Sequence, residues 1–328
     1  MKIQFKTLGL LVLPAIFGLA AAHAQDKSAK KAPGINVSYM DLTVKPSDNF
    51  FRFVNGTWLD KTEIPKDKTR WGSFDELRQN TDKDVLVILA DATKGGKYKP
   101  TSDQGKAIIM YQSAMDTVAR NKQGIAPLKP YLAQIDAVKN VADLQKLMMQ
   151  TEADGGSVGF FGVGVGADEK DSNRNVVSLG PGSLGLPDRD YYVSEDADSK
   201  EKRAKYVLHV AKMLQFLGES PAAAQADAEK IIALEIQMSV PRLDRVERRD
   251  SKIQYNPTAI ADLNTLTPAI DWNTYLKGVG FAKVDTVIVS QPKYMKGLQT
   301  MFTENNVDAW KAYMRWTLLS RSSSRLST

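Results

Sequence analysis

The sequence predicts a mainly helical fold that carries one or two short β-hairpins or strands. Apolar residues recur at helical spacing in several segments after residue 75, which is typical of amphipathic helices. The spacing changes to a period of two at Phe161–Gly166, which indicates a strand. The chain has 328 residues, of which 43% are hydrophobic and 25% charged. This composition is ordinary for a globular protein, and the length suits two ordinary domains or one large one.

The first predicted helices precede the strand region. Asp103–Ala119 should form an amphipathic helix, and Asn140 should cap a second helix that runs to about Met149. The apolar stripe of the first helix comprises Ala107, Tyr111, Ala114, Met115 and Val118.

Phe161–Gly166 alternates apolar residues with glycine, so the predicted strand has one bulky face and one bare face. Asn175–Leu179 is its expected partner, and the polar residues 167–174 form the connection of the hairpin. The glycines do not form a nucleotide-binding loop, because both G-x-G-x-x-G and the Gly-Lys-Ser/Thr ending are missing. They indicate close backbone packing on a strand.

The C-terminal half again reads as helical. A helix is predicted over Lys202–Leu217 with Gly218 as its end, and another begins at Ser220-Pro221 and runs past Met238. Thr286–Val289 is a possible second strand. Pro257, Pro268 and Pro292 are each expected to begin a further helix.

The N-terminus resembles a secretory signal peptide over residues 1–24. Lys2 and Lys6 supply positive charge, Leu8–Ala22 is apolar, and Ala22–Ala24 fits a cleavage site. An uncleaved membrane anchor is the alternative, although the apolar run is short for a bilayer span. After cleavage no stable membrane span is expected. Because the chain has no cysteine, export to a bacterial periplasm or exterior is favoured.

Charge excludes one class of partner. Removing Lys2 and Lys6 with the signal leaves 42 basic residues against 38 acidic residues. This excess is too small, and too well mixed with acidic residues, to predict binding to nucleic acid.

The histidine content limits the possible chemistry. The chain has two histidines, and His23 lies in the signal segment. A zinc site of the H-E-x-x-H type needs two histidines one helical turn apart. With His209 alone and no cysteine, no conventional zinc site is expected in the mature chain. His209 is predicted to be a partly buried structural residue.

The carboxylates give a second limit. Asp188 and Asp190 lie in a turn-rich loop beside Arg189, where we expect them to fix the loop by hydrogen bonds and ion pairs. The alternative is a glycosidase carboxylate pair. The charged run Arg242–Asp250 is interpreted as a solvated helix end. A serine triad lacks the G-x-S-x-G turn.

Arg70 is a different kind of candidate, because an aromatic-rich segment follows it and Asp75 lies five residues on. A guanidinium group can bind a carboxylate, such as a peptide C-terminus, through two hydrogen bonds. The alternative is an ordinary surface ion pair.

Several motifs occur in a fixed order: PSDNFF at 46–51, NGTW at 55–58, RWGSFD at 70–75 and GLPDRDYY at 185–192. This ordered set resembles the neprilysin and endothelin-converting-enzyme family of zinc metallopeptidases, and GLPDRDYY is among its most specific motifs. The resemblance covers about residues 36 to 319.

The resemblance implies a two-lobed enzyme with a thermolysin-like zinc lobe and a helical cap around a cavity that admits small peptides. It implies that Arg70 binds the C-terminal carboxylate of the substrate, with Asp75 beside it. The zinc ligands of the family have no counterpart here, so the catalytic lobe is expected to be absent. No catalytic or metal-binding residue, and no cofactor, is predicted in this chain, whereas zinc serves the complete family enzyme.

The expected organisation therefore has five parts. They are a signal peptide (1–24), a flexible linker (25–34), a segment that would pack on the catalytic lobe (35–74), an incomplete helical cap (75–320) and an atypical disordered tail (321–328). The expected function is that of a bacterial exported zinc oligopeptidase, cut short before the zinc motif and inactive alone. The alternative is a non-catalytic helical module that binds peptides or proteins.

Overall fold

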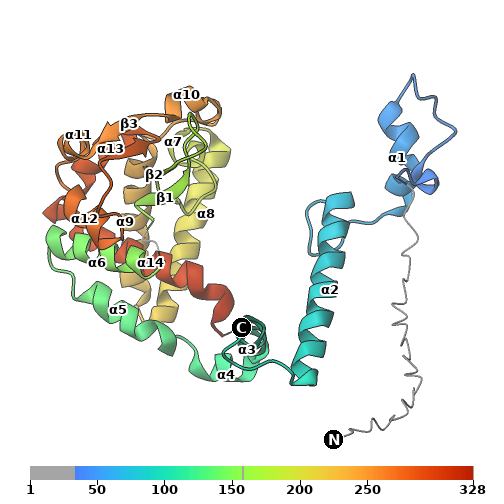
Figure 1. Ribbon diagram of the computed structural model, residues 1–328, viewed down its shortest axis with the longest axis horizontal. Helices are drawn as coiled ribbons and strands as arrows, with labels where there is room; N and C mark the ends of the chain where they lie inside the picture. Colours follow the sequence, from blue (N-terminus) through green and yellow to red (C-terminus); the bar gives the residue numbers. More distant parts are fainter. Residues whose placement is uncertain (1–33, 157–158, 328) are drawn as a thin grey trace, which may run out of the picture. The chain divides into compact units, whose positions relative to one another are not determined.

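The structure is a computed structural model that describes residues 34–156 and 159–327 (Figure 1). The predicted signal peptide and most of the predicted linker lie outside these residues. Within them, no helix is both long and apolar enough to span a bilayer. The chain divides into two compact units, residues 1–97 and 98–328. The expected boundary at residue 75 therefore differs from this division, which assigns α2 to the first unit.

The first unit contains η1 (Val37–Tyr39), α1 (Phe50–Lys61) and α2 (Ser73–Gly95). The Asn49 side chain caps α1 by accepting a hydrogen bond from the backbone N–H of Arg52 at 2.9 Å. The preceding segment is tied to α1, because the Thr57 hydroxyl donates to the carbonyl of Met40 at 2.7 Å. Gly56 permits this approach, since a Cβ there would lie 2.5 Å from the Cβ of Asp41.

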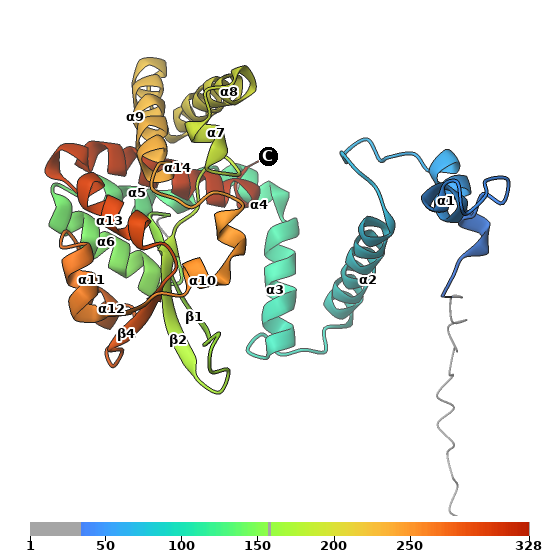
Figure 2. The same ribbon diagram turned by 90° about the horizontal axis from the view of Figure 1, so that it is seen from above.

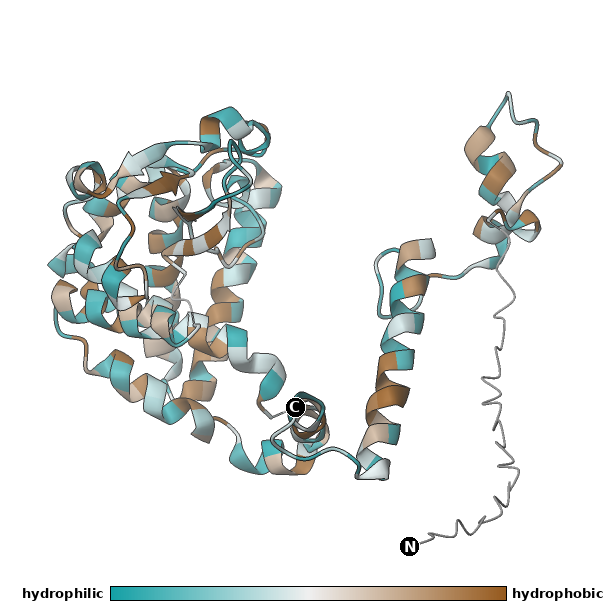
Figure 3. Ribbon diagram, in the orientation of Figure 1, coloured by the Kyte–Doolittle hydropathy of each residue, from teal (hydrophilic) through white to brown (hydrophobic). Residues whose placement is uncertain are grey.

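Large apolar side chains of the first unit remain uncovered. Phe50 and Phe51 are 68% and 65% exposed, and α2 contains no buried residue. Figure 3 shows an apolar stretch along α2, which includes the exposed residues Val85–Ile88. Because burial of such side chains normally stabilises a helix, α2 has little packing to hold it within the described residues.

The second unit is a helical domain with a small sheet at one side (Figures 1 and 2). Its α-helices are α3 (Asp103–Met115), α4 (Thr117–Gln123), α5 (Lys129–Asp136), α6 (Val141–Ala153), α7 (Asp190–Val193), α8 (Ala197–Leu214), α9 (Pro221–Ser239), α10 (Ser251–Gln254), α11 (Ile260–Leu266), α12 (Trp272–Gly278), α13 (Pro292–Met301) and α14 (Val307–Ser322). Short 3-10 turns lie at η2 (Ala126–Leu128), η3 (Gln215–Leu217), η4 (Glu247–Arg249), η5 (Glu304–Asn306) and η6 (Ser323–Arg325).

The sheet has four strands in the order β1-β2-β4-β3. They are β1 (Phe161–Ala167), β2 (Asn175–Pro181), β3 (Pro257–Ala259) and β4 (Thr286–Val289). β1 and β2 form the predicted antiparallel hairpin, and β3 pairs antiparallel with β4. β2 and β4 run parallel, with Ser178 opposite Ile288. The sheet therefore has more strands than expected, because the three-residue β3 is too short to give a periodic signal.

The core lies where α9 and α14 pack beside α8 and the sheet. Trp310 is fully buried, and its ring centroid lies 4.0 Å from that of Phe160 and 5.1 Å from that of Phe302. Its indole N–H donates to the carbonyl of Met301 at 3.0 Å. This bond satisfies the one polar group of the side chain, so the indole can be buried at little cost.

Several predicted helix ends are confirmed. Asn140 caps α6 by accepting from the backbone N–H of Asp143 at 2.8 Å, and Ser220 caps α9. Gly218 ends the helical segment in the left-handed region with φ of 93°. Pro292 begins α13 as expected.

Other local predictions are wrong. The helix expected over Asp103–Ala119 breaks at Asp116, whose side chain caps α4, and its stripe residues Met115 and Val118 are 60% and 79% exposed. Pro257 begins β3, and α12 begins at Trp272 after an Asp271 cap. Aspartate and proline are found in turns as well as at the starts of helices. Contacts with distant parts of the chain therefore decide whether such a segment forms a turn, a strand or a helix.

The predicted disordered tail differs from the structure over residues 321–325. α14 extends to Ser322, and η6 follows it. Serine is only a weak helix breaker, so packing of the preceding apolar turns can carry the helix through it.

Candidate functional site

The two residues predicted to contact substrate lie in the first unit. Arg70 is exposed just before α2, and Asp75 lies in the first turn of that helix. No hydrogen bond or ion pair joins the two side chains. The negative charge of Asp75 in the first turn interacts favourably with the positive N-terminal end of the dipole of α2. Arg70 has no hydrogen-bond or ion-pair partner in the part of the chain that the structure describes, and its predicted role stays a prediction.

The residues present do not fit a zinc ion. Among the described residues, no three His, Asp or Glu side chains are grouped so that they could hold a metal. His209 is exposed on α8, and its ring centroid lies 5.8 Å from that of Trp316 in an edge-to-face arrangement. The prediction of a partly buried histidine is wrong, although an aromatic contact remains.

The second unit brings the GLPDRDYY segment, residues 185–192, against α9. Glu235 of α9 is fully buried and accepts three hydrogen bonds. They come from the backbone N–H of Gly185 at 3.0 Å, the Tyr192 hydroxyl at 3.0 Å and the Tyr206 hydroxyl at 3.2 Å. One carboxylate therefore holds both ends of the segment and the neighbouring helix α8.

Burial raises the pKa of Glu235 to about 7, although the three donors oppose the change. Such a pKa would suit a general acid or base. Glu235 has no exposed surface, however, and its oxygens are occupied by the loop. We therefore interpret it as a positioning residue for residues 185–192.

The tyrosines around Glu235 complete a buried network. Trp316 donates from its indole N–H to the Tyr206 hydroxyl at 2.8 Å, and the backbone N–H of Leu186 donates to the Tyr192 hydroxyl at 2.6 Å. Burial raises the pKa of both tyrosines, and the nearby Glu235 carboxylate adds to the effect. Gly185 is required here, because a Cβ would lie 1.8 Å from the Tyr206 oxygen.

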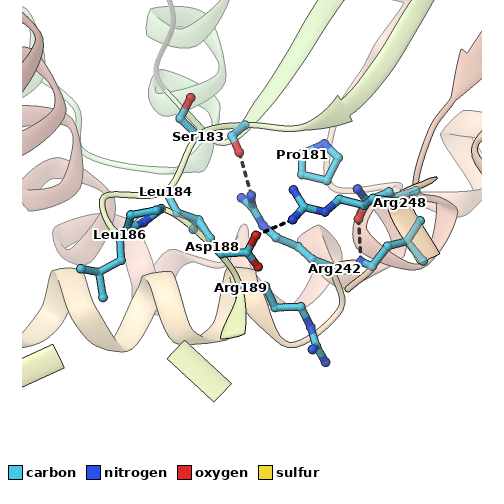
Figure 4. Close-up of a pocket in the computed structure, with 12 residues that line it drawn as sticks. Pro181, Ser183, Leu184, Leu186, Asp188, Arg189, Arg242 and Arg248 are labelled. Atoms are coloured by element: carbon cyan, nitrogen blue, oxygen red, sulfur yellow. Dashed lines mark hydrogen bonds and ion pairs between the residues drawn. The ribbon is translucent and has the colours of Figure 1, made fainter. Parts of the chain in front are cut away.

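Asp188 forms the second anchor of the segment, as the sequence predicts. Its Oδ2 lies 3.1 Å from Arg245 Nε and 2.5 Å from Arg248 Nη2, as Figure 4 shows for Arg248. Burial raises the pKa of Asp188, but hydrogen bonds from the Asp190 backbone and the two guanidinium groups outweigh it and lower the pKa overall. Asp190 lies 3.4 Å from Arg189 in a weaker pair.

Arg242 makes the charged run at 242–250 more than a solvated helix end, so that interpretation is wrong for part of it. Its guanidinium donates to the carbonyls of Gly182 at 2.8 Å and Met238 at 3.1 Å. It also lies over the ring of Tyr294, 4.9 Å from the centroid. The spacing of charges in the sequence could not show the bond to Gly182, because that carbonyl lies sixty residues away from Arg242.

A cavity of about 320 Å³ lies between these anchors. Its wall includes Pro181, Leu186, Asp188, Arg242 and Arg248, as Figure 4 shows. Arg242 Nη1 and Arg248 Nη2 are bonded to the loop, whereas Arg189 Nε and Arg242 Nη2 are buried without a hydrogen-bond partner within residues 34–156 and 159–327. The arrangement holds a loop rigidly and provides no paired nucleophile and base for catalysis.

The sequence interpretation missed Glu235. Ile231, Leu234, Glu235 and Met238 follow helical spacing, so a carboxylate occupies the buried stripe of α9. A glutamate in the buried stripe of a helix requires buried hydrogen-bond donors, so its position in the apolar pattern is the signal in the sequence that indicates this network.

Comparison with known proteins identifies similar chains. A sequence profile of the N-terminal region of "Peptidase family M13" matches residues 46–328. The chain is 26% identical to mouse endothelin-converting enzyme 1 over 298 residues, which are 88% of this chain and 38% of that protein. It is also 26% identical to Neprilysin-3 of Drosophila melanogaster over 308 residues, 88% of this chain and 39% of that protein.

The fold is similar to a solved structure of Mycobacterium tuberculosis zinc metalloprotease Zmp1 in complex with an inhibitor. The TM-score is 0.80 with 29% identity, over 90% of this chain and 45% of that one. The chain thus spans about two fifths of the length of the curated relatives that it matches.

Proposed function

Because this chain belongs to peptidase family M13, whose members are zinc metallopeptidases, we propose that it forms the N-terminal, cap-bearing part of an exported bacterial zinc metalloendopeptidase that cleaves small peptides. The observation that carries the proposal is the similarity over 90% of the chain to a protein described as a zinc metalloprotease. The signal-like residues 1–24 and the absence of cysteine support export from a bacterial cell.

The part of this chain in that function is to shape the substrate space. The zinc chemistry requires ligands that this sequence does not supply, so the catalytic step is assigned to none of its residues. A rigid helical domain, tied at residues 185–192 by Glu235 and Asp188, suits a wall that limits access to small peptides.

This polypeptide alone should not hydrolyse peptides. The purified chain should release no fluorescence from a quenched fluorescent nonapeptide above the buffer rate, and mass spectrometry should find substoichiometric zinc. The reason is that His209 is the one histidine outside residues 1–33, and a zinc site of this type needs two. His209→Ala is the matched control, and it should behave as the unmodified chain. Hydrolysis that a chelator stops and that His209→Ala abolishes would contradict the proposal.

Arg70 should contribute to binding a peptide carboxylate. Calorimetry with a short peptide that has a free C-terminus should show binding that Arg70→Ala weakens roughly tenfold to hundredfold, as expected for a charge-assisted hydrogen bond. Amidation of the peptide should have the same effect. Arg78→Ala is the matched control, because Arg78 is also exposed near the start of α2. Equal binding by the Arg70 and Arg78 variants would remove Arg70 from the site.

Binding without catalysis is the second candidate function. The observation that favours it is that the exposed Arg70 has no ion-pair partner within residues 34–156 and 159–327. The same calorimetry tests it, since a stand-alone binding module must retain a peptide without any added chain. An absence of measurable binding in the unmodified chain would exclude this candidate.

A further inference from the structure

The outer edge of β1 carries backbone groups that the described structure leaves unpaired. β1 is a terminal strand of the sheet, and its neighbour on the inner side is β2 (Figure 2). Two hydrogen bonds define which residues face inward. The backbone N–H of Asp168 donates to the carbonyl of Arg174 at 3.0 Å, and that of Gly182 donates to the carbonyl of Phe160 at 3.2 Å.

Antiparallel strands alternate their bonding direction from residue to residue. Gly162, Gly164 and Gly166 therefore direct their backbone groups toward β2. Val163 and Val165 direct theirs outward, where they meet no hydrogen-bond partner in residues 34–156 or 159–327.

This edge lacks the devices that usually prevent strand pairing. Natural edge strands carry charged residues, prolines or bulges. Phe161–Ala167 has none of these: it contains no charge and no proline, and its register with β2 is unbroken. Val165 is 57% exposed, and Gly166 and Ala167 are exposed too, whereas Val163 is half-buried against the core, so solvent reaches the edge most freely at its C-terminal end.

The glycines shape the surface beside the edge. A Cβ on Gly162 or Gly166 would meet no atom within 4 Å, whereas one on Gly164 would lie 3.1 Å from the Ser178 Oγ, so open space lies over the two outer glycines of this face. An extended chain beside β1 would place alternate side chains over this space. Large apolar side chains would cover exposed glycine backbone there, as aromatic side chains do for edge glycines in sheets.

We propose that the outer edge of β1 binds an extended peptide by strand addition, with large apolar side chains of the peptide over the glycine face. Backbone hydrogen bonds to Val163 and Val165 would supply affinity, and the glycine face would supply selectivity. The five residues Val163–Ala167 provide an edge of about 17 Å, which matches a peptide of five or six residues. The proposal deepens the proposed function, because peptides are the substrates of the family.

The probe is the acetylated and amidated hexapeptide Lys-Leu-Thr-Leu-Thr-Lys. Its blocked C-terminus keeps it from a carboxylate site such as the one proposed at Arg70. Hydrogen exchange of the full chain should show at least tenfold slower exchange at the Val163 and Val165 amides when the peptide is in excess. Replacing both leucines of the peptide with glycine should weaken binding at least tenfold.

Val165→Pro is the decisive variant. It removes an outward N–H that β2 does not use, so the hairpin can remain while the peptide loses a donor. Fluorescence anisotropy should give binding at least tenfold weaker for Val165→Pro, whereas Val165→Thr should bind as the unmodified chain does. If circular dichroism shows that Val165→Pro is unfolded, the exchange result on the unmodified chain decides alone.

Equal affinity of Val165→Pro, or the absence of protection at both amides, overturns the proposal. Protection that appears without peptide and rises with protein concentration identifies a second copy as the occupant and also overturns it. Because no hydrolysis is measured, these results are independent of whether a complete family enzyme cleaves peptides.

Discussion

Replacing Trp310 with alanine should lower the free energy of unfolding of the second unit by about 3–5 kcal/mol. The indole is fully buried, contacts the rings of Phe160 and Phe302, and donates to the carbonyl of Met301. The variant loses burial of a large apolar surface and leaves a cavity that rigid neighbours cannot fill. It also removes the donor to the Met301 carbonyl. Urea unfolding of the full chain, followed by near-ultraviolet circular dichroism, measures the change.

Phe216→Ala is the matched control for Trp310→Ala. Phe216 is also an aromatic residue of the second unit, but it is 60% exposed. Its removal should change the free energy of unfolding by less than about 0.5 kcal/mol. Similar losses in the two variants would contradict the assignment of Trp310 to the centre of the core.

Glu235→Ala should destabilise the chain by a comparable amount, about 3–5 kcal/mol. The substitution leaves three buried donors without an acceptor: the Gly185 N–H and the hydroxyls of Tyr192 and Tyr206. Residues 185–192 should become mobile in particular, which limited proteolysis after Arg189 would detect. Glu235→Gln is the matched control, because it keeps the shape and one carbonyl acceptor. A small effect of Glu235→Ala would show that the network does not hold the loop.

The pH dependence of the free energy of unfolding shows how much the ionisation of Glu235 matters, apart from the space that its side chain fills. In the folded protein Glu235 stays protonated up to about pH 7, whereas the ordinary pKa of a glutamate side chain is 4.5. Between these values the folded state binds more protons than the unfolded state. The contribution of protonated Glu235 to the free energy of unfolding is therefore fully present below pH 4.5, and it is lost as the pH rises through about 7. The loss should be roughly 3 kcal/mol. Glu235→Gln should lack this decline, and an unchanged decline in that variant would assign it to another group.

Helices with strong local signals could be predicted from the sequence. The caps at Asn140 and Ser220, the stop at Gly218 and the glycine-alternating strand all depend on neighbours within a few residues. Local chemistry decides such features, so a single sequence is enough. The break at Asp116 shows the limit, because an aspartate within an apolar pattern can either face solvent or cap a new helix.

The candidate site was less predictable because its parts lie far apart in the chain. The loop around Asp188 predicts that this carboxylate forms ion pairs, but not that Arg245 and Arg248 are the partners. The charged run around Arg242 predicts exposure to solvent, although Arg242 donates to the carbonyl of Gly182. Glu235 was missed because one polar residue hardly disturbs an apolar stripe. In each case the partners lie about thirty to sixty residues away in the sequence.

The parallel pairing of β2 with β4 has a consequence for biosynthesis. Ser178 lies opposite Ile288, so the pairing joins residues more than one hundred positions apart. A ribosome that adds about 5–20 residues per second needs several seconds to synthesise that interval. During this time the β1–β2 hairpin is complete, but the edge of β2 that later pairs with β4 is open, and so is the outer edge of β1. The nascent chain therefore exposes two strand edges to pairing until Val289 emerges, and a chaperone that binds extended segments should associate with it during that interval.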